Sequence, residues 1–249
     1  MKHLDNYKGI IPAFYACYDA EGNINPEAVR ALTQYYIDKG VKGLYLNGSS
    51  GECIYQSVED RKCVLENVMA VVAGKLTIIN HVACNNTKDS IELAKHSEEL
   101  GVDAIAAIPL FISVFLNMLL QLIGMPFQLT RPNTDFIIYN IPQLAGTVLT
   151  SSLYQEMLKN DRVIGVKNSS MPVQDIQNFC SIGGKDHIVF NGPDEQFLAG
   201  RLMGAEAGIG GTYGAMPELF LTLDNYIAKQ KSWKKPKRFN MLSMTLLEF

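Results

Sequence analysis

A lysine stands at the end of a short apolar run near the middle of the chain. Residues 163–166 are Val-Ile-Gly-Val, Lys167 follows, and the polar residues Asn168, Ser169 and Ser170 come next. Burying an ammonium group is costly unless its charge is paired or its proton is lost. A lysine that gives up its proton readily is a nucleophile for carbonyl carbon. Lys167 is therefore a candidate for Schiff-base chemistry, and the alternative is a strand-end lysine whose ammonium reaches solvent or an ion pair.

Two other polar groups could serve the same chemistry. Tyr139 closes a second apolar run and offers a hydroxyl that could carry a proton. Residues 48–51, Gly-Ser-Ser-Gly, offer the hydroxyls of Ser49 and Ser50 together with backbone N–H groups, which suit a carboxylate. The alternative for this turn is an ordinary Gly/Ser loop. Together these groups predict attack on a keto acid, with the lysine as nucleophile.

The elements around these residues repeat in strand-then-helix order. Expected strands lie at residues 9–15, 43–46, 76–82, 104–109, 136–142, 163–167, 187–192 and 207–212. Helices are expected after seven of them, for example from Asn25-Pro26 to Gly40, where an N-cap, a first-turn proline and a terminal glycine coincide. This order predicts a wholly parallel sheet, and eight strands favour closure into an α/β (β/α)8 TIM barrel. An open doubly wound sheet is the alternative, but no Gly-x-Gly-x-x-Gly follows the first strand.

A barrel would bring the polar groups to one end of the molecule. In this fold the chemistry lies where strands end and the following loops begin. Lys167, Tyr139, Ser49-Ser50 and Asp194-Glu195 all fall at such positions. Asp194 and Glu195 have a second interpretation as acids favoured by the dipole at a helix N-terminus.

Composition narrows the class of protein. The chain has 249 residues, is 47% hydrophobic and carries a formal net charge of -3. That charge gives no reason to expect nucleic acid or a membrane surface as a partner. Five scattered cysteines without CxxC spacing predict reduced thiols rather than disulfides or a zinc site. With no apolar secretory segment at the N-terminus, we expect a cytoplasmic protein that takes a small-molecule substrate.

Two stretches do not fit the barrel pattern. Residues 111–129 are uncharged and have neither helical nor strand periodicity, so a membrane span is formally possible but would interrupt a barrel. The basic tail from residue 231 could bind nucleic acid or be solvated. We expect a barrel over residues 1–230 with an anomalous segment at 111–130, followed by an aberrant tail at 231–249. A reading-frame shift in both stretches would explain them, because the shifted codons allow amphipathic helices.

The motifs resemble those of the pyruvate-dependent class I aldolases, which include N-acetylneuraminate lyases and dihydrodipicolinate synthases. The matching stretches are residues 43–52, 138–146, 165–167 and 191–195, within a resemblance that covers residues 9–110 and 132–229. The resemblance implies that Lys167 forms the imine with a keto acid and that no metal or organic cofactor is needed. It implies proton transfer by Tyr139 and binding of the pyruvate carboxylate by Ser49 and Ser50.

Other residues separate the two branches of this family. Synthases are expected to carry an arginine two residues after the proline of the Y-N-x-P motif, where this chain has Leu144. A leucine cannot supply the bidentate contact to a second carboxylate. The resemblance to the lyase branch implies that Gly192, Asp194 and Glu195 bind the sugar part of the substrate, with Ser169 near it.

The resemblance thus implies cleavage of N-acetylneuraminate to pyruvate and N-acetylmannosamine, by a homotetramer. The alternatives are a synthase or another pyruvate aldolase, and a barrel that binds a keto acid without turnover. The chain departs from the lyase pattern at Gly211, where a serine is usual, and in lacking a tyrosine within residues 111–130. It is also shorter than the family at the C-terminus, so we expect a truncated barrel.

Overall fold

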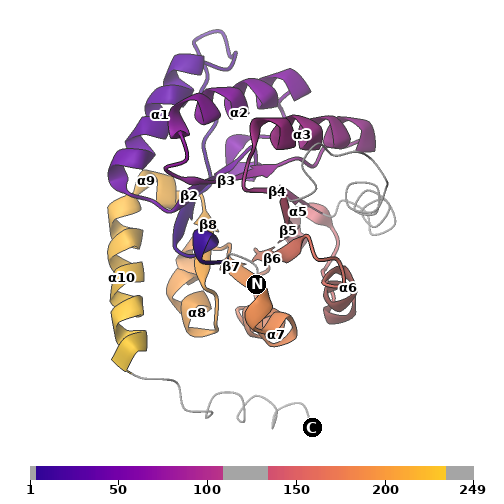
Figure 1. Ribbon diagram of the computed structural model, residues 1–249, viewed down its shortest axis with the longest axis vertical. Coiled ribbons are helices and arrows are strands. Elements are labelled where there is room, and N and C mark those ends of the chain that lie inside the picture. The colour runs from indigo at the N-terminus through magenta and orange to yellow at the C-terminus, as the bar shows by residue number, and fades with distance from the viewer. Residues whose placement is uncertain (1–3, 109–133, 234–249) are drawn as a thin grey trace.

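The computed structural model describes residues 4–108 and 134–233, with side chains described as far as residue 229. Its centre is a sheet of eight parallel strands, as the TIM-barrel prediction requires (Figure 1). The strands are β1 (Ile10–Pro12), β2 (Gly43–Leu46), β3 (Thr77–His81), β4 (Ala104–Ala107), β5 (Asp135–Asn140), β6 (Val163–Asn168), β7 (Ile188–Asn191) and β8 (Ala207–Gly210). The strand order is β1-β8-β7-β6-β5-β4-β3-β2.

A single bridge joins the two ends of this sheet. Ala13, just after β1, pairs in parallel with Tyr45 of β2. The Phe14 N–H donates to the Tyr45 carbonyl at 2.9 Å, and the Ala13 N–H donates to the Gly210 carbonyl of β8 at 2.9 Å. The chain after β1 is therefore bonded to both neighbours, and the sheet closes into a barrel at the end where its strands finish.

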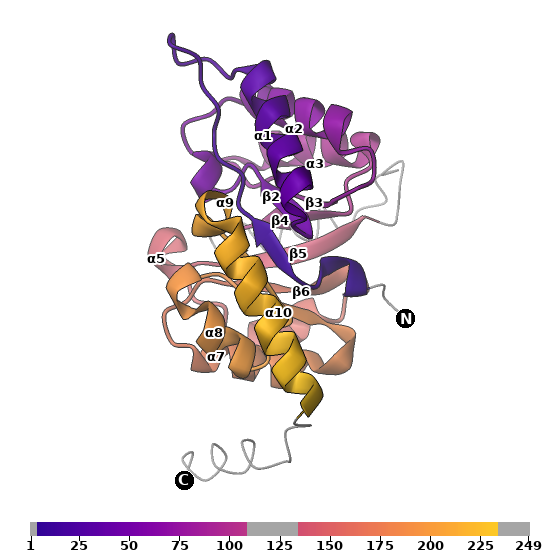
Figure 2. The same ribbon diagram turned by 90° about the vertical axis from the view of Figure 1, so that its left-hand side faces the viewer.

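The helices lie outside the barrel. They are α1 (Pro26–Lys39), α2 (Val58–Val72), α3 (Thr87–Leu100), α5 (Pro142–Ala145), α6 (Ser151–Met157), α7 (Gln174–Gly183), α8 (Phe197–Leu202), α9 (Thr212–Ala215) and α10 (Pro217–Trp233). Figure 2 shows α10 crossing the outer surface beside β1. No helix within the described ranges is long and apolar enough to span a bilayer.

Local signals explain where the longer helices begin. The Asn25 side chain accepts the N–H groups of Glu27 and Ala28, and Pro26 occupies the first turn of α1. Ser57 and Asp60 form a reciprocal capping box at the start of α2. These starts agree with the sequence-based expectation to within a residue or two.

The end of β5 differs from the expectation. The strand was expected to continue through Pro142, but it finishes at Asn140 and Pro142 opens the short helix α5. Proline has no N–H for a ladder and its fixed φ suits a first helical turn, so the local chemistry favours the helix. As a result, Leu144 lies on α5 and not on an extended loop.

Apolar side chains fill the barrel and the space between strands and helices. The interior cluster includes Ile11, Ile79, Ile137, Ile164 and Phe190, all with at most 1% of their surface exposed. A larger cluster packs the outer faces of the strands against α1, α2, α3, α6 and α7. With both faces of every strand covered, the strands are nearly continuous hydrophobic runs.

Both anomalous stretches of the sequence lie largely outside the described residues. The segment at 111–130 falls entirely within the undescribed range 109–133. In the expected tail, α10 continues through Trp233, and residues 234–249 are outside the description. The reading-frame hypothesis and the domain boundary at residue 230 therefore remain predictions.

Candidate active site

The register of two neighbouring strands brings the predicted nucleophile beside the predicted proton carrier. Tyr139 of β5 is the direct partner of Lys167 of β6. The Lys167 Nζ lies 3.8 Å from the centroid of the Tyr139 ring. Lys167 is 4% exposed and Tyr139 is 2% exposed, so the pair is almost withdrawn from bulk water. The alternative of a strand-end lysine in solvent is therefore wrong.

A second aromatic ring, not singled out from the sequence, also lies against the amine. The Tyr45 ring centroid lies 4.3 Å from Nζ, and the Tyr45 and Tyr139 rings meet edge to face at 5.9 Å. A Cβ at Gly48 would come within 2.6 Å of the Tyr45 ring, so this position needs a glycine. Among the described residues, no carboxylate forms an ion pair with Lys167.

The loop after β2 supplies a hydroxyl next to Tyr139. The Ser49 Oγ lies 3.2 Å from the Tyr139 hydroxyl oxygen, and either atom can donate. Ser49 opens the short 3-10 turn η2 (Ser49–Gly51), in which its side chain is exposed to the cleft. Ser50 lies beside Gly211, where an added Cβ would meet its Oγ at 3.0 Å. This loop therefore faces both Tyr139 and the end of β8.

A buried amide network holds the ends of β5 and β6 together. The Asn140 Nδ2 donates to the Asn168 Oδ1 at 2.7 Å, and the Asn168 Nδ2 donates to the Ser170 Oγ at 2.9 Å. The Ser169 N–H donates to the Asn140 carbonyl at 2.7 Å. Asn140 directly follows Tyr139 and Asn168 directly follows Lys167, so the network fixes the backbone beside these two residues.

The remaining predicted binders sit on the loop after β7. The Gly192 N–H donates to the Asn168 carbonyl at 2.8 Å, and a Cβ on Gly192 would overlap the Ser169 Oγ. Asp194 turns toward the next loop, where its Oδ2 accepts the Thr212 N–H at 2.7 Å and the Thr212 hydroxyl at 2.8 Å. Glu195 is exposed at the rim.

Asp194 thus has a structural partner as well as a predicted ligand role. Its Oδ1 is buried without a hydrogen-bond partner among the described residues. Burial and the Asp194 charge raise the pKa of Tyr15, which donates its hydroxyl to the Gly211 carbonyl at 2.5 Å. The backbone and hydroxyl donors of Thr212 are therefore already engaged by Asp194.

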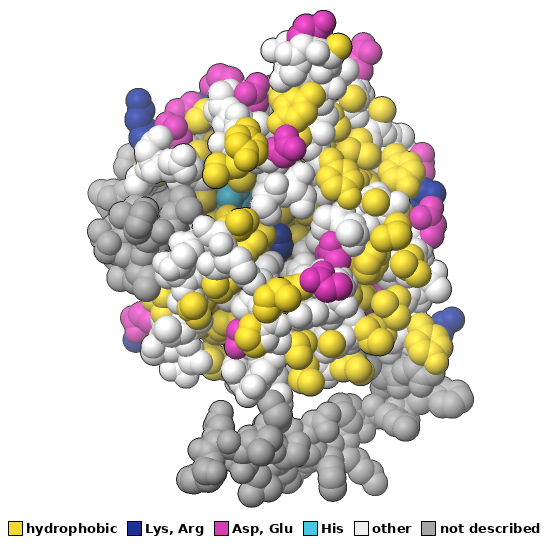
Figure 3. All heavy atoms as spheres, turned by 180° about the vertical axis from the view of Figure 1, so that it is seen from behind, with side chains coloured by type: hydrophobic (Ala, Val, Ile, Leu, Met, Phe, Trp, Pro, Cys, Tyr) yellow, Lys and Arg dark blue, Asp and Glu magenta, His cyan; other side chains and the backbone are white. Residues whose placement is uncertain are grey.

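All eight predicted site residues line one cleft of about 580 Å³: Ser49, Ser50, Tyr139, Lys167, Ser169, Gly192, Asp194 and Glu195. Figure 3 shows a central depression on this face, with a basic side chain inside and acidic side chains at the edge. Leu144, which is 62% exposed, also lines the cleft. The eight residues therefore meet at one end of the barrel, where the strands finish.

Two further buried residues behind the cleft were not anticipated. The His81 Nδ1 donates to the Asn47 carbonyl at 3.0 Å, and burial, assisted by the charges of Arg61 and Lys167, lowers the pKa of His81 well below its ordinary value. The Arg61 guanidinium, 1% exposed, donates to the carbonyls of His81 and Ala83 at 2.5 and 2.9 Å. In the sequence, His81 is only a polar residue at the end of a buried strand, and Arg61 is only a polar residue on the inward face of a helix.

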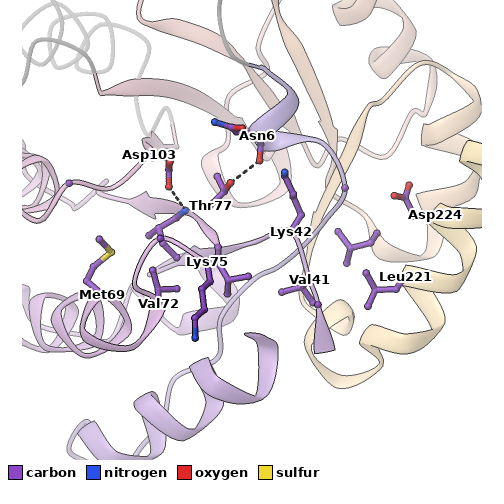
Figure 4. A pocket seen from close by; sticks show the side chains of 17 residues that line it. Asn6, Val41, Lys42, Met69, Val72, Lys75, Thr77, Asp103, Leu221 and Asp224 are labelled. Atoms are coloured by element: carbon purple, nitrogen blue, oxygen red, sulfur yellow. Dashed lines mark hydrogen bonds between the residues drawn. The ribbon is translucent and has the colours of Figure 1, made fainter. Parts of the chain in front are cut away.

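A separate cavity of about 530 Å³ opens at the other end of the barrel (Figure 4). There the Thr77 hydroxyl donates to the Asn6 carbonyl at 2.7 Å, and the Asp103 carboxylate accepts the Ile78 N–H at 2.8 Å. Its lining also includes Lys42 and Lys75. In this fold the N-terminal end of the strands contributes stability, and the chemistry lies at the opposite end.

The geometry of the cleft supports one kind of chemistry. The primary amine of Lys167 is almost fully buried and lies beside the phenol of Tyr139. The Ser49 hydroxyl lies next to that phenol. Such an arrangement can add the amine to a carbonyl carbon and move protons through the two hydroxyls.

Known proteins share this sequence and this fold. The model of the dihydrodipicolinate synthetase family matches residues 6–231. The chain is 66% identical over 227 residues to the N-acetylneuraminate lyase of Mediterraneibacter gnavus, and the aligned region covers 91% of this chain and 72% of that protein. It is 33% identical over 217 residues to the N-acetylneuraminate lyase of Rhizobium meliloti, covering 87% and 71% respectively. A solved structure of a catalytic lysine mutant of the Ruminococcus gnavus sialic acid aldolase has a TM-score of 0.86 at 63% identity, covering 93% of this chain and 76% of that one. The chain belongs to the dihydrodipicolinate synthetase family.

Proposed function

We propose that this chain is a class I lyase that cleaves N-acetylneuraminate to pyruvate and N-acetylmannosamine. The observation that carries the proposal is the placement of the Lys167 amine 3.8 Å from the Tyr139 ring in a cleft that also holds Ser49 and Ser50. Relatives at 66% and 33% identity bear the name N-acetylneuraminate lyase, which supports the same substrate here.

In the proposed reaction Lys167 is the nucleophile. Its amine lone pair attacks the keto carbon, and loss of water leaves a protonated imine. The bond between the third and fourth carbons then breaks, and its electron pair moves toward the imine nitrogen to give an enamine. Protonation of the enamine and hydrolysis release pyruvate and restore the amine. No metal or organic cofactor enters this scheme.

Tyr139 is proposed to carry the proton. Its hydroxyl receives the proton that leaves the substrate hydroxyl as the carbon–carbon bond breaks. As the phenol takes up that proton it passes its own to the Ser49 Oγ at 3.2 Å, and Ser49, which is exposed in the cleft, passes a proton on to solvent, so the phenol stays neutral. Ser49 and Ser50 would hold the carboxylate next to the keto group.

The sugar end of the substrate is proposed to lie toward the loop after β7. Gly192, Asp194 and Glu195 line that side of the cleft, and Ser169 lies between them and Lys167. Glu195 is the exposed acceptor for sugar hydroxyls, whereas the Oδ2 of Asp194 already accepts two donors from Thr212. We therefore assign direct recognition chiefly to Glu195 and the placing of the loop to Asp194.

The second candidate is a synthase that condenses pyruvate with an amino aldehyde. Leu144 argues against it, because its side chain lines the cleft without any group that could pair with a second carboxylate. A third candidate, a barrel that binds keto acids without turnover, shares the same residues and differs only in rate.

Reductive trapping separates these candidates. The full chain is incubated with pyruvate and borohydride, and the peptide that contains Lys167 is weighed by mass spectrometry. An adduct on Lys167, absent from Lys167→Arg, is expected. A folded protein without adduct would exclude both enzymatic candidates. Assays with N-acetylneuraminate and with aspartate semialdehyde then divide lyase from synthase, and an adduct without turnover of either would favour the binding-only barrel.

We also infer a cytoplasmic homo-oligomer, with the tetramer as the expected form. The five cysteines, each partly buried and none in a disulfide, suit a reducing compartment. Ile54 and Tyr55, 71% and 83% exposed beside the cleft, are large apolar side chains of the kind that interfaces cover. Light scattering coupled to size-exclusion chromatography would measure the assembly directly.

A further inference from the structure

The side-chain nitrogen of Lys167 is faced by aromatic rings. The Nζ lies 3.8 Å from the Tyr139 ring centroid and 4.3 Å from that of Tyr45, well within the range of a cation–π interaction. Such interactions are strongest where water is excluded, and Tyr45 is 0% exposed. No ion pair with a carboxylate occurs at this nitrogen among the described residues, whereas both ring faces lie against it.

We propose that Tyr45 is a further catalytic residue, whose ring face keeps the imine on Lys167 protonated during the reaction. This inference rests on the proposed Schiff-base function. It gives Tyr45 a role distinct from that of Tyr139, because stabilising a cation needs only the ring face and not the hydroxyl.

The surroundings of Tyr45 exclude proton transfer as its role. Its hydroxyl oxygen is buried without a hydrogen-bond partner among the described residues. Burial raises the pKa of Tyr45 well above its ordinary value, so the phenol stays neutral. Gly48 leaves the space in which this ring lies against the loop.

The other ionisable groups around the amine do not supply a counter-charge. His81, from β3, packs its ring centroid 6.2 Å from that of Tyr45 and stays neutral because burial lowers its pKa. Cys53, from the loop after β2, stays a thiol because burial raises its pKa. Arg61, from α2, is a second buried cation whose N–H groups point to backbone carbonyls. With a neutral histidine, a neutral thiol and a second cation nearby, the π faces are left to stabilise the charge.

The charge matters because of the chemistry of imines. An imine is a weaker base than the amine from which it forms, so its proton is lost at a lower pH. The neutral imine is a poor acceptor for the electron pair of a breaking carbon–carbon bond, whereas the protonated imine is a good one. A group that favours the protonated imine therefore extends the pH range in which bond cleavage proceeds.

Fluorination of the ring tests the proposal without changing its shape. Tyr45→Phe keeps the face, and phenylalanine carrying one, two or three fluorine atoms at position 45 withdraws negative potential in steps. Each variant is saturated with pyruvate and treated with cyanoborohydride, which reduces the protonated imine and leaves the neutral imine. The rate of adduct formation on the Lys167 peptide is followed across the alkaline pH range.

Tyr45→Phe is the reference from which the fluorinated series starts, because it keeps the ring face and removes only a hydroxyl that has no partner among the described residues. On the alkaline side of the pH profile, the rate of adduct formation falls as the imine loses its proton. The pH of this fall (the alkaline limb) should decrease with each fluorine, by about one pH unit over the series, or roughly tenfold in rate at a fixed alkaline pH. The same series at Tyr154 is the matched control. Tyr154 is also 0% exposed with an unpartnered hydroxyl among the described residues, but it packs on Phe179 behind the barrel.

The outcomes separate this inference from the proposed function. If the natural chain forms no adduct, the Schiff-base function itself is lost. If the natural chain forms the adduct but the limb stays fixed across the Tyr45 series, or moves equally in the Tyr154 series, only the role of Tyr45 is overturned. Should Tyr45→Phe not fold, fluorotyrosines at position 45 provide the same graded series on the natural side chain.

Discussion

At the scale of single residues, the centre of the cleft is the amino group of Lys167, which is almost fully buried. Lys167 is 4% exposed, and its nitrogen lies against the rings of Tyr139 and Tyr45. Isolated ammonium groups in such places are unstable unless something favours the charge or the proton leaves. Here the aromatic faces supply attraction to the cation without the tight ion pair that would occupy the nucleophile.

Replacing Tyr139 by Phe should separate imine formation from turnover. The ring face beside Lys167 remains, so pyruvate should still be trapped on the lysine by borohydride. The proton carrier is gone, so kcat for cleavage should fall by roughly 10²–10⁴-fold. Ser49→Ala, which removes only the neighbouring hydroxyl, serves as the milder control. Equal loss of trapping and turnover in Tyr139→Phe would contradict the proton-transfer role.

His81 should make the fold sensitive to acid. Burial lowers its pKa in the folded state well below 6.5, the value expected for an unfolded chain. Below pH 6.5 the unfolded state therefore binds a proton that the folded state does not bind. The free energy of unfolding consequently falls as the pH drops below about 6.5, by up to ~1.4 kcal/mol per pH unit. Urea unfolding across this range should show a shallower loss for His81→Gln than for the natural chain.

At the scale of elements, hydrogen bonds between asparagine side chains join the ends of neighbouring strands. The amides of Asn140 and Asn168 join the ends of β5 and β6, directly after the reactive pair. The Asn47 Nδ2 donates to the Asn80 Oδ1 at 2.8 Å, which ties the ends of β2 and β3 in the same way. Side-chain amides are suited to this task because each can both donate and accept.

The capping box of α2 is a test at this scale. The Ser57 Oγ accepts the Asp60 N–H at 3.1 Å, and the Asp60 carboxylate accepts the Ser57 N–H at 3.0 Å. Ser57→Ala removes one of these bonds and should lower the free energy of unfolding by about 1 kcal/mol. Ser57→Thr retains the capping oxygen and should stay close to the natural value. Chemical denaturation of the two variants decides the point, and an equal loss in both would count against the cap.

At the scale of the whole molecule, stability and chemistry lie at opposite ends of the barrel. The 3-10 turn η1 (Leu4–Tyr7) lies at the N-terminal end of the strands, where Tyr7 is buried among the interior side chains. Its hydroxyl lies 2.8 Å from the Asp135 carboxylate and 3.0 Å from the Asp103 carbonyl, and it can donate to either. This contact joins the start of the chain to β5 and to the residue before β4.

Tyr7→Phe should therefore weaken the fold and spare the reaction. Losing a hydrogen bond to a charged carboxylate should lower the free energy of unfolding by about 2 kcal/mol. The kcat/KM of the folded fraction should be unchanged, since the cleft lies at the other end of the strands. Urea titration and steady-state assays on the same preparation measure both quantities. A fall in kcat/KM without loss of stability would show that the two ends are coupled.

The sequence alone was sufficient for the periodic and local features. Eight apolar runs, seven of them followed by an expected helix, predicted the parallel barrel, because strand burial and helix capping depend on neighbouring residues. The position of Lys167 at a strand end predicted its place in the cleft, because all parallel strands finish at one end. Pro142 was misassigned, since a proline is compatible with both a strand end and a first helical turn.

Only the tertiary structure could identify the groups that surround the reactive amine. Tyr45, His81 and Arg61 are spread over β2, β3 and α2, and nothing in their local sequence distinguishes them from ordinary core residues. Their meeting behind Lys167 depends on the closure of the barrel, which sets residues far apart in the chain at contact distance. The reactive pair could be read from the sequence because its chemistry belongs to the residues themselves, whereas the environment that sets its charge is a property of the closed fold.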